Sequence, residues 1–350
     1  MTEQTTSPGS LPADSPRFPQ VASPDSLSAE RLSAVLSSTP RGLALGRLAP
    51  VAVLAAGWQA RTDPQPPTQA RVVVFAGDNG IAQREVSAYA PEASLTQAEE
   101  ITAGAGPVNA LARVQQAGVR LVDVCLDHDV WGDERVSRSC PAIDEADAMS
   151  PDDLERALAI GARIADSEVD AGADLLIPGE LGVGGTTVTA ALMGAATRTE
   201  PVSVIGPGSG ITDETWKIKV TAIRDAMFRA RGRHDDTEFL LRTIGSPVLA
   251  ALNGFIAQAA VRRTPVLLDG AAVTAAAFLA NRLAPGTKDW CLAGDLSPEP
   301  AHLLALNELG LTPLLALDTA LGQGCGAITA LGLVRSACEL AGTFAPTDPA

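Results

Sequence analysis

The chain has 350 residues, of which 46% are hydrophobic and 3% aromatic, and its formal net charge is −15. Such acidity disfavours binding to the phosphate backbone of nucleic acids, and so few aromatic rings disfavour a stacking surface for single strands. The length allows one large domain or two ordinary ones. Because no apolar run approaches the ~18 residues of a membrane span, we expect neither a nucleic-acid partner nor a membrane span.

The N-terminal residues 1–25 are rich in proline, serine and threonine and lack the basic-then-apolar pattern of a signal peptide. We expect them to form a disordered tail. The five cysteines form no CxxC pair, and the three histidines lack the spacing of metal ligands. These patterns favour a reducing compartment over a disulfide framework or a zinc site, so we expect a cytoplasmic protein.

The elements that follow alternate short apolar runs with Ala-rich amphipathic stretches. A helical segment over about 26–37 comes first. The apolar runs, most of which end near glycine or an acid, span 71–78, 119–127, 174–180, 202–208, 265–270, 289–295 and 312–318. Continuous apolar runs separated by helices are typical of parallel strands buried on both faces. We therefore expect a doubly wound α/β fold, a Rossmann-like three-layer arrangement with a mostly parallel sheet.

Several helix boundaries are marked in the sequence. Ser150 as N-cap and Pro151 in the first turn predict a helix that ends near position 171. Another helix begins at about Thr215, and a last one covers about 325–342.

This order of elements predicts two domains besides the tail. We expect an α/β domain over 61–324. We also expect a small helical domain, formed by residues 26–60 together with about 325–350.

Two glycine-rich loops at the carboxyl ends of predicted strands indicate a phosphate site, because ligands of open parallel sheets bind there. The loop over 179–187 enters a helix, where free backbone N–H groups and two hydroxyls suit a phosphate. The second loop, 206–210, is followed by a lysine whose ammonium reaches a phosphate as a point charge. The candidate phosphate and ribose ligands are Gly182, Gly184, Gly185, Thr186, Thr187, Gly208, Ser209, Gly210, Lys219 and Asp269.

Each of these positions also has a plainer interpretation. Glu180 closes a predicted strand and is a candidate general base, whereas a loop or capping acid is the alternative for that residue alone. Asp78, Asp269 and Asp295 either bind ribose hydroxyls or cap helices. Ser87, Tyr89 and Glu92 lie in a proline-containing loop that either covers a planar ligand or is a surface turn. No dinucleotide fingerprint or P-loop is present, so a dinucleotide-dependent oxidoreductase is not supported.

A resemblance rests on several blocks that occur in a fixed order. They are VVVFAGDNGIA with SAYAPE, DLLIPGELGVGGTTVTAAL, GPGSGITDETWKIK, RTPVLLDGAAVTAAAFLA and LGQGCGAITALGL. From about residue 38 to 342 the chain resembles the nicotinate-nucleotide–dimethylbenzimidazole phosphoribosyltransferases. The resemblance implies a parallel α/β domain, a small helical domain from both chain ends, a homodimer, and no metal or other cofactor.

The implied reaction transfers phosphoribose from nicotinate mononucleotide to 5,6-dimethylbenzimidazole or a related aromatic base. Its products are α-ribazole 5′-phosphate and nicotinate, in cobalamin nucleotide-loop assembly. The resemblance assigns catalysis to Glu180 and to the position of Gln323, where the family has a glutamate that takes a proton from the incoming base. The base-binding residues that it implies are Asp78, Asn79, Ser87, Tyr89, Leu181 and Leu321.

The chain departs from the family pattern mainly around the base. The amide of Gln323 orients an N–H group but cannot accept a proton. Asn79 and Asp295 each stand where the pattern has a histidine, and Thr96 and Gly185 replace a glutamine and an asparagine. Two hypotheses stay open: a phosphoribosyltransferase with a changed base pocket, or a catalytically weakened paralogue that binds a mononucleotide without efficient turnover.

Overall fold

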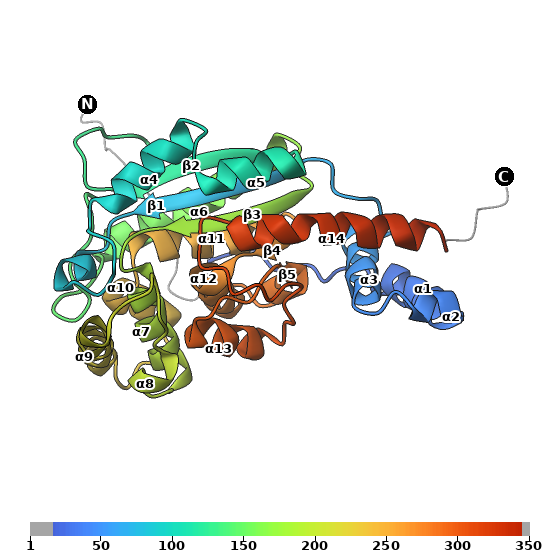
Figure 1. The fold of residues 1–350 in the computed structure, drawn as a ribbon. Coiled ribbons are helices and arrows are strands. Elements are labelled where there is room, and N and C mark those ends of the chain that lie inside the picture. The colour runs from blue at the N-terminus through green and yellow to red at the C-terminus, as the bar shows by residue number, and fades with distance from the viewer. Residues whose placement is uncertain (1–16, 345–350) are drawn as a thin grey trace, which may run out of the picture.

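The computed structural model describes residues 17–344, which form one parallel sheet between two layers of helices (Figure 1). The strands are β1 (Ala70–Gly77), β2 (Gly118–Cys125), β3 (Leu175–Leu181), β4 (Val266–Leu268) and β5 (Cys291–Ala293). Their order in the sheet is β2-β1-β3-β4-β5, and every neighbouring pair is parallel. The predicted doubly wound α/β fold is confirmed.

Helices connect the strands and flank the sheet. They are α1 (Ser26–Ser37), α2 (Pro40–Leu43), α3 (Leu48–Gln59), η1 (Gly80–Arg84), α4 (Ala93–Thr102), α5 (Pro107–Gln115), α6 (Pro151–Asp170), α7 (Gly185–Thr197), α8 (Pro201–Val204), α9 (Asp213–Arg229), α10 (Thr237–Ile244), α11 (Pro247–Val261), α12 (Gly270–Leu283), η2 (Thr287–Trp290), α13 (Pro300–Leu309) and α14 (Cys325–Gly342). The four helices predicted from the sequence are present. The hydroxyl of Ser150 accepts a hydrogen bond from the Asp153 N–H at 3.1 Å and caps α6 as predicted.

Both faces of the sheet are buried, which is why the strands read as continuous apolar runs. In β1, Val73 and Phe75 point to a core formed with α6, α7, α11 and α12. Val72 and Val74 point to a second core formed with α4, α5 and α14. Alternate side chains of one strand thus join two separate cores, and the sheet holds the two helical layers together.

The helices α6 and α11 pack so closely that glycine is required on both. A Cβ atom built on Gly161 of α6 would lie 1.8 Å from the carbonyl oxygen of Ala251. A Cβ built on Gly254 of α11 would lie 2.0 Å from the carbonyl oxygen of Leu158. Backbone cannot move aside as a side chain does, so these two helices contact each other along their main chains.

Two predicted strands are absent from the described sheet. The segment 202–208 begins as the short helix α8, since Pro201 at its first position favours helical φ, and continues as the glycine loop. The segment 312–318 forms only an isolated parallel bridge between Leu315 and Asp295. A short apolar run does not by itself determine a strand, and both strand predictions were wrong; no residue of 312–318 is buried.

The predicted disordered tail is wrong for residues 17–25, while residues 1–16 lie outside the described part of the chain. Phe18 and Val21 are buried in the core beside α6. Arg17 pairs with Glu238 at 2.9 Å, and the indole N–H of Trp290 donates to the carbonyl oxygen of Ala22 at 2.8 Å. Two apolar residues and these polar contacts order a segment whose proline- and serine-rich composition predicted disorder.

The described residues of the predicted helical domain lie together at one end of the molecule, where α1–α3 pack beside the second half of α14 (Figure 1). Their apolar side chains continue into the core on the adjacent sheet face. A separate domain therefore stays a prediction. By length and composition α14 is the one helix of the described chain that could cross a membrane, and 56% of it is buried inside the protein.

The contact between α6 and α11 gives the first testable prediction. Replacing Gly161 with alanine forces the two backbones apart, and we expect the free energy of unfolding to fall by ~1–3 kcal/mol, as for other overpacked cores. Urea denaturation followed by circular dichroism measures this change. The matched control is Ser167→Ala on the exposed side of α6, where a small side chain contacts little. Equal stability of the two variants would show that the helices can separate without cost.

Candidate active site

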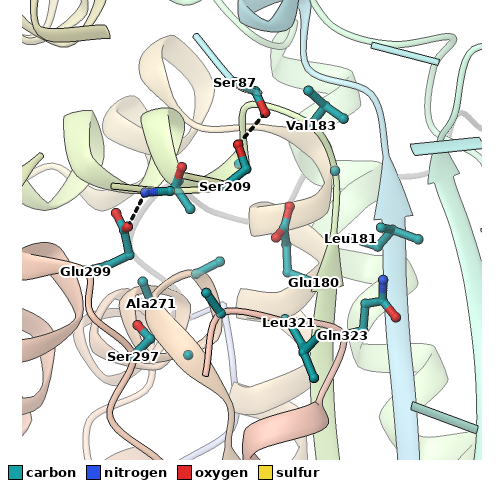
Figure 2. Close-up of a pocket in the computed structure, with 18 of the residues that line it drawn as sticks. Ser87, Glu180, Leu181, Val183, Ser209, Ala271, Ser297, Glu299, Leu321 and Gln323 are labelled. Carbon is teal, nitrogen blue, oxygen red and sulfur yellow. Dashed lines mark hydrogen bonds between the residues drawn. The ribbon is translucent and has the colours of Figure 1, made fainter. Parts of the chain in front are cut away.

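The main pocket opens at the carboxyl ends of β3, β4 and β5 and has a volume of about 500 Å³. The chain order of the sheet reverses between β1 and β3, so this edge is the switch point where open α/β sheets bind ligands. Loops from four parts of the chain surround it: the segment after η1, the two glycine loops, and the turn before α14 (Figure 2).

Three acids stand at the ends of three neighbouring strands on the pocket floor: Glu180 on β3, Asp269 after β4 and Asp295 after β5. Asp269 accepts hydrogen bonds from the N–H groups of Gly324 and Ala327, each at 3.0 Å. Asp295 accepts one from the Gly270 N–H at 3.1 Å. We call Glu180, Asp269 and Asp295 the acid row.

Burial and mutual repulsion make the acid row hold protons more tightly than exposed acids do. Burial raises the pKa of Glu180 to about 8, and the negative charge of Asp269 adds to the shift. Burial raises the pKa of Asp295 to about 7, again with a contribution from Asp269. The carboxylate of Glu180 receives no hydrogen bond from the described residues and points into the middle of the pocket (Figure 2). It is therefore free to meet a ligand, and its ionised form, which becomes abundant as pH approaches 8, is basic enough to take a proton.

Glycines make room for the acids. A Cβ on Gly185 would lie 2.4 Å from the Glu180 carboxylate, and one on Gly326 would lie 2.3 Å from that of Asp295. The glycine that begins α7 and the glycine inside the first turn of α14 thus let carboxyl groups approach the backbone. From the sequence Gly185 was a candidate phosphate ligand, and no pattern singled out Gly326.

The first glycine loop and the start of α7 offer donors for an anion. The N–H groups of Gly184, Thr186 and Ser209 donate to no acceptor among residues 17–344. Behind them, Lys219 is fully buried, and its ammonium donates to the Thr186 hydroxyl at 2.9 Å and to the carbonyl oxygen of Gly206 at 3.5 Å. Burial lowers the pKa of Lys219, while the charge of Glu299 opposes that shift. Unpaired N–H groups backed by an ammonium are suited to a phosphate.

The second glycine loop is held in place by Glu299. Its carboxylate accepts a hydrogen bond from the Gly208 N–H at 2.7 Å (Figure 2). A Cβ on Gly206 would lie 2.5 Å from the same carboxylate, so glycine is needed there for this contact. Gly208 and Gly210 have φ values of +53° and +88°, which glycine adopts without strain.

The turn before α14 brings Gln323 into the pocket wall. Gly322, Gln323 and Gly324 have φ values of +63°, +61° and +90°, a left-handed run that is costly for a residue with a side chain. The Gln323 N–H donates to the carbonyl oxygen of Glu180 at 3.1 Å, which fixes the turn on the end of β3. Its side chain is 4% exposed and donates through Nε2 to Oε1 of Gln97 at 2.8 Å. The Oε1 atom of Gln323 is buried without a partner in the described structure.

A buried amide oxygen without a donor costs free energy unless a ligand supplies one. The strained turn and this oxygen together mark position 323 as a binding position. Leu181, Leu321, Ser87 and Tyr89 also line the pocket. Leu181 is buried, whereas Tyr89 and Leu321 are 57% and 53% exposed. The apolar side chains among them suit a flat ring, and we call this part of the lining the base slot.

Besides Lys219, three residues predicted for the site lie behind its wall. Asp78 accepts a hydrogen bond from the Asp127 N–H at 2.8 Å, and Asn79 donates to the carbonyl oxygen of Val183 at 3.1 Å. Thr187 is fully buried, because one residue along a helix turns the side chain by about 100° from the direction of Thr186. Asp78 and Asn79 support loops of the pocket, and none of the three lines it.

Gln97 is a pocket residue that the sequence did not reveal. The family comparison placed the corresponding glutamine at Thr96, but Thr96 is exposed and its hydroxyl donates to the carbonyl oxygen of Glu92. Gln97 lies on the pocket side of α4, three residues after the buried Ser94. The helical period of the buried residues is the signal that would have distinguished Gln97 from Thr96.

In the described part of the chain, no group of three or more His, Cys, Asp or Glu side chains is arranged to hold a metal ion, and this includes the acid row. The geometry of the pocket instead combines anion donors, a basic carboxylate and an apolar slot. These features suit a substrate that carries a phosphate and reacts with an aromatic base.

Comparisons with known proteins agree with this geometry. A family model described as phosphoribosyltransferase matches residues 22–350. A nicotinate-nucleotide–dimethylbenzimidazole phosphoribosyltransferase from Corynebacterium glutamicum is 57% identical over 296 residues, covering 85% of this chain and 83% of that protein. The protein of the same name from Mycobacterium avium is 49% identical over 326 residues, covering 91% and 93%. The crystal structure of CobT from Thermus thermophilus superimposes with a TM-score of 0.84 at 34% identity, covering 90% of this chain and 95% of that one.

The raised pKa of Glu180 predicts how stability depends on pH. The folded protein keeps a proton on this carboxyl up to about pH 8, whereas the unfolded chain releases it near the ordinary value of 4.5. The wild-type protein therefore loses stability as pH rises through this interval, by at most ~1.4 kcal/mol per pH unit. Glu180→Gln does not titrate, so we expect its stability relative to wild type to increase from pH 5 to pH 8 and then level off.

Urea denaturation at pH 5, 6.5, 8 and 9 measures that trend. The control is Glu30→Gln, at an exposed position of α1 outside the pocket lining, measured at the same pH values. A constant difference for Glu180→Gln would contradict the raised pKa.

Proposed function

This chain belongs to the nicotinate-nucleotide–dimethylbenzimidazole phosphoribosyltransferase family, and we propose that its pocket transfers phosphoribose from nicotinate mononucleotide to 5,6-dimethylbenzimidazole. The products are α-ribazole 5′-phosphate and nicotinate, in cobalamin biosynthesis. The observation that carries the proposal is the placement of unpaired backbone donors over a buried lysine beside a basic carboxylate in one pocket.

The phosphate binds to the free N–H groups at the start of α7 and in the second glycine loop. The Lys219 ammonium donates to the Thr186 hydroxyl from the side away from the pocket. This hydroxyl in turn donates to the phosphate and is polarised by the ammonium. The sugar then lies over the acid row, where Asp269 and Asp295 accept hydrogen bonds from ribose hydroxyls or stabilise positive charge on the ring. Backbone donors are suited to this pocket because they add no side chain that would pair with the acids.

Transfer breaks the bond from C1′ to the pyridinium nitrogen, and its electron pair returns to that nitrogen as neutral pyridine. The leaving group therefore needs little help from an acid. The lone pair of one imidazole nitrogen forms the new bond to C1′. The other nitrogen then carries a proton that must leave, and this is the step for which a general base is useful.

Glu180 is the group best suited to take that proton. Its carboxyl group points into the pocket, and a pKa of about 8 makes its ionised form a stronger base than an exposed glutamate, so that proton transfer is favoured as pH rises toward that value. Gln323 acts differently, because an amide oxygen accepts a hydrogen bond but keeps no proton. We infer that its Oε1 accepts the one N–H of the incoming base in the bound complex and orients the ring for attack, and that this hydrogen bond is exchanged for one to Glu180 when the proton leaves.

The names of the relatives do not favour the alternative of a nucleotide-binding paralogue with little turnover. We also propose that the protein is a cytoplasmic homodimer. Its five cysteines are all free and buried, as suits a reducing compartment. The dimer rests on the family resemblance alone.

The experiment that tests the activity measures nicotinate release from nicotinate mononucleotide by mass spectrometry. We expect release only when dimethylbenzimidazole or a related base is added, together with the matching ribazole phosphate. Glu180→Gln removes the base, so kcat falls by ~10²–10⁴-fold while the KM for the nucleotide changes little. Glu30→Gln, at an exposed position of α1 outside the pocket lining, serves as the control and keeps the wild-type rate. Absence of acceptor-dependent release in the wild-type protein at high enzyme concentration would falsify the proposed function.

Two substitutions at position 323 separate an orienting role from a missing base. Because Glu180 already supplies the base, Gln323→Glu is expected to change kcat by less than ~10-fold. Gln323→Leu loses the acceptor oxygen, so the KM for the base rises by about tenfold, the effect of one lost hydrogen bond of ~1.4 kcal/mol. Steady-state kinetics with the base as varied substrate measure both values. A gain of ~10²-fold or more in Gln323→Glu would instead favour the weakened paralogue.

A further inference from the structure

Two loops on opposite sides of the pocket mouth are joined by a short chain of hydrogen bonds. Ser209 belongs to the second glycine loop, and Ser87 belongs to the segment after η1. Their hydroxyl oxygens are 3.0 Å apart (Figure 2). The Ala88 N–H donates to the Ser209 hydroxyl at 2.9 Å, and the Tyr89 N–H donates to the Ser87 hydroxyl at 3.1 Å. The Ser209 hydroxyl is therefore the link between a phosphate loop and the wall of the base slot.

Each hydroxyl has one proton to donate, and the positions of these protons decide which serine is the donor in the hydrogen bond between Ser87 and Ser209. Between Ser87 and Ser209 either oxygen can donate while the pocket is empty. A phosphate in the glycine loop would take the Ser209 proton, since a phosphate oxygen is the stronger acceptor. Ser87 must then donate to Ser209, and the Ser209 oxygen accepts from both Ser87 and Ala88. Every bond of the chain is kept, but its direction becomes fixed.

These hydrogen bonds lie at the pocket mouth, so their strength depends on whether a ligand is bound. Ser209, Ala88 and Tyr89 are exposed in the empty pocket, where water competes for the same groups. A sugar phosphate that covers them removes this water, and hydrogen bonds to an anion are about twice as strong as neutral ones. The ends of both loops stay anchored, by the buried Val86 on one side and by the Glu299 contact to Gly208 on the other.

A second serine makes a useful contrast. Ser94 is fully buried, and its hydroxyl accepts the Val183 N–H at 3.0 Å, so it joins α4 to the first glycine loop permanently. Occupancy of the pocket has no means of altering this buried contact. Of these two links between the base side and the phosphate side, only the one through Ser209 is exposed to the ligand.

We propose that Ser209 is a positioning residue that couples the two substrates, so that a phosphate held in the loop 206–210 orders the segment 87–89 and raises the affinity of the base slot. The proposal rests on the proposed function, because it takes the phosphate site and the base slot as given. It adds that nucleotide binding prepares the acceptor site, and that by linkage the acceptor raises the affinity for the phosphorylated sugar by the same factor.

The test uses ribose 5-phosphate, which carries the phosphate and the sugar but has no leaving group, so that no reaction follows. Isothermal titration gives the Kd of dimethylbenzimidazole with and without saturating ribose 5-phosphate. In the full-length wild-type protein we expect the base to bind at least ~5-fold more tightly in its presence, the lower end of usual coupling between sites.

Four variants separate coupling from simple structural damage. In Ser209→Ala and Ser87→Ala the coupling factor falls to about one. Ser209→Thr keeps the hydroxyl and restores the factor. Ser203→Ala, at an exposed serine upstream of the same loop and outside the pocket lining, retains the wild-type factor. In steady-state kinetics the Ser87→Ala variant shows a raised KM for the base with little change in kcat.

The outcomes distinguish this inference from the proposed function. If ribose 5-phosphate binds but the wild-type coupling factor is one, or if Ser209→Ala keeps the wild-type factor, the coupling role of Ser209 is refuted and the transferase assignment stands. If ribose 5-phosphate does not bind to the wild-type protein at millimolar concentration, the phosphate site itself is misplaced, and both proposals fall together.

Discussion

The carboxylate of Asp269 fixes the geometry on which the pocket depends. It lies at the end of β4 and accepts the N–H groups of Gly324 and Ala327, so a negative charge sits at the start of α14, where the helix dipole favours it. This contact ties the last helix to the middle of the sheet and holds the left-handed turn that presents Gln323. Burial raises the pKa of Glu180 and of Asp295, and the charge of Asp269 beside them adds to both shifts. One buried acid thus fixes the shape of the wall and contributes to the basicity of the floor.

The acid row would repel a phosphate bound in the same pocket. In the proposed site the acids and the phosphate donors lie on different sides of the pocket. Acids occupy the strand ends, where burial keeps two of them partly protonated near neutral pH. The phosphate side is built from backbone N–H groups, and its one ammonium, Lys219, is placed behind a hydroxyl. A lysine that projected into the cavity would pair with the acid row. Its burial behind Thr186 leaves the acids free for the ribose and the base.

Much of this architecture was predictable from the sequence, since it depends on local patterns. Continuous apolar runs gave a doubly wound parallel sheet, and the loops around Gly184 and Gly208 placed the pocket at its carboxyl edge. The strand predictions failed at 202–208 and 312–318, where the same short apolar runs also suit a helix start or a loop. The prediction of disorder failed for residues 17–25 because the burial of Phe18 and Val21 depends on a surface that is distant in the sequence.

What the sequence determined was therefore the type of fold and the kinds of groups available: glycine loops, strand-end acids and an amide where a glutamate was expected. Only the tertiary structure decided which groups meet. It placed Gln97 rather than Thr96 in the pocket, set Asp78, Asn79 and Thr187 behind its wall, and brought Ser209 against Ser87 across 122 positions of the chain. The physical reason is that side-chain direction changes by about 100° per helical residue, and contacts between distant loops follow from packing, which no local pattern encodes.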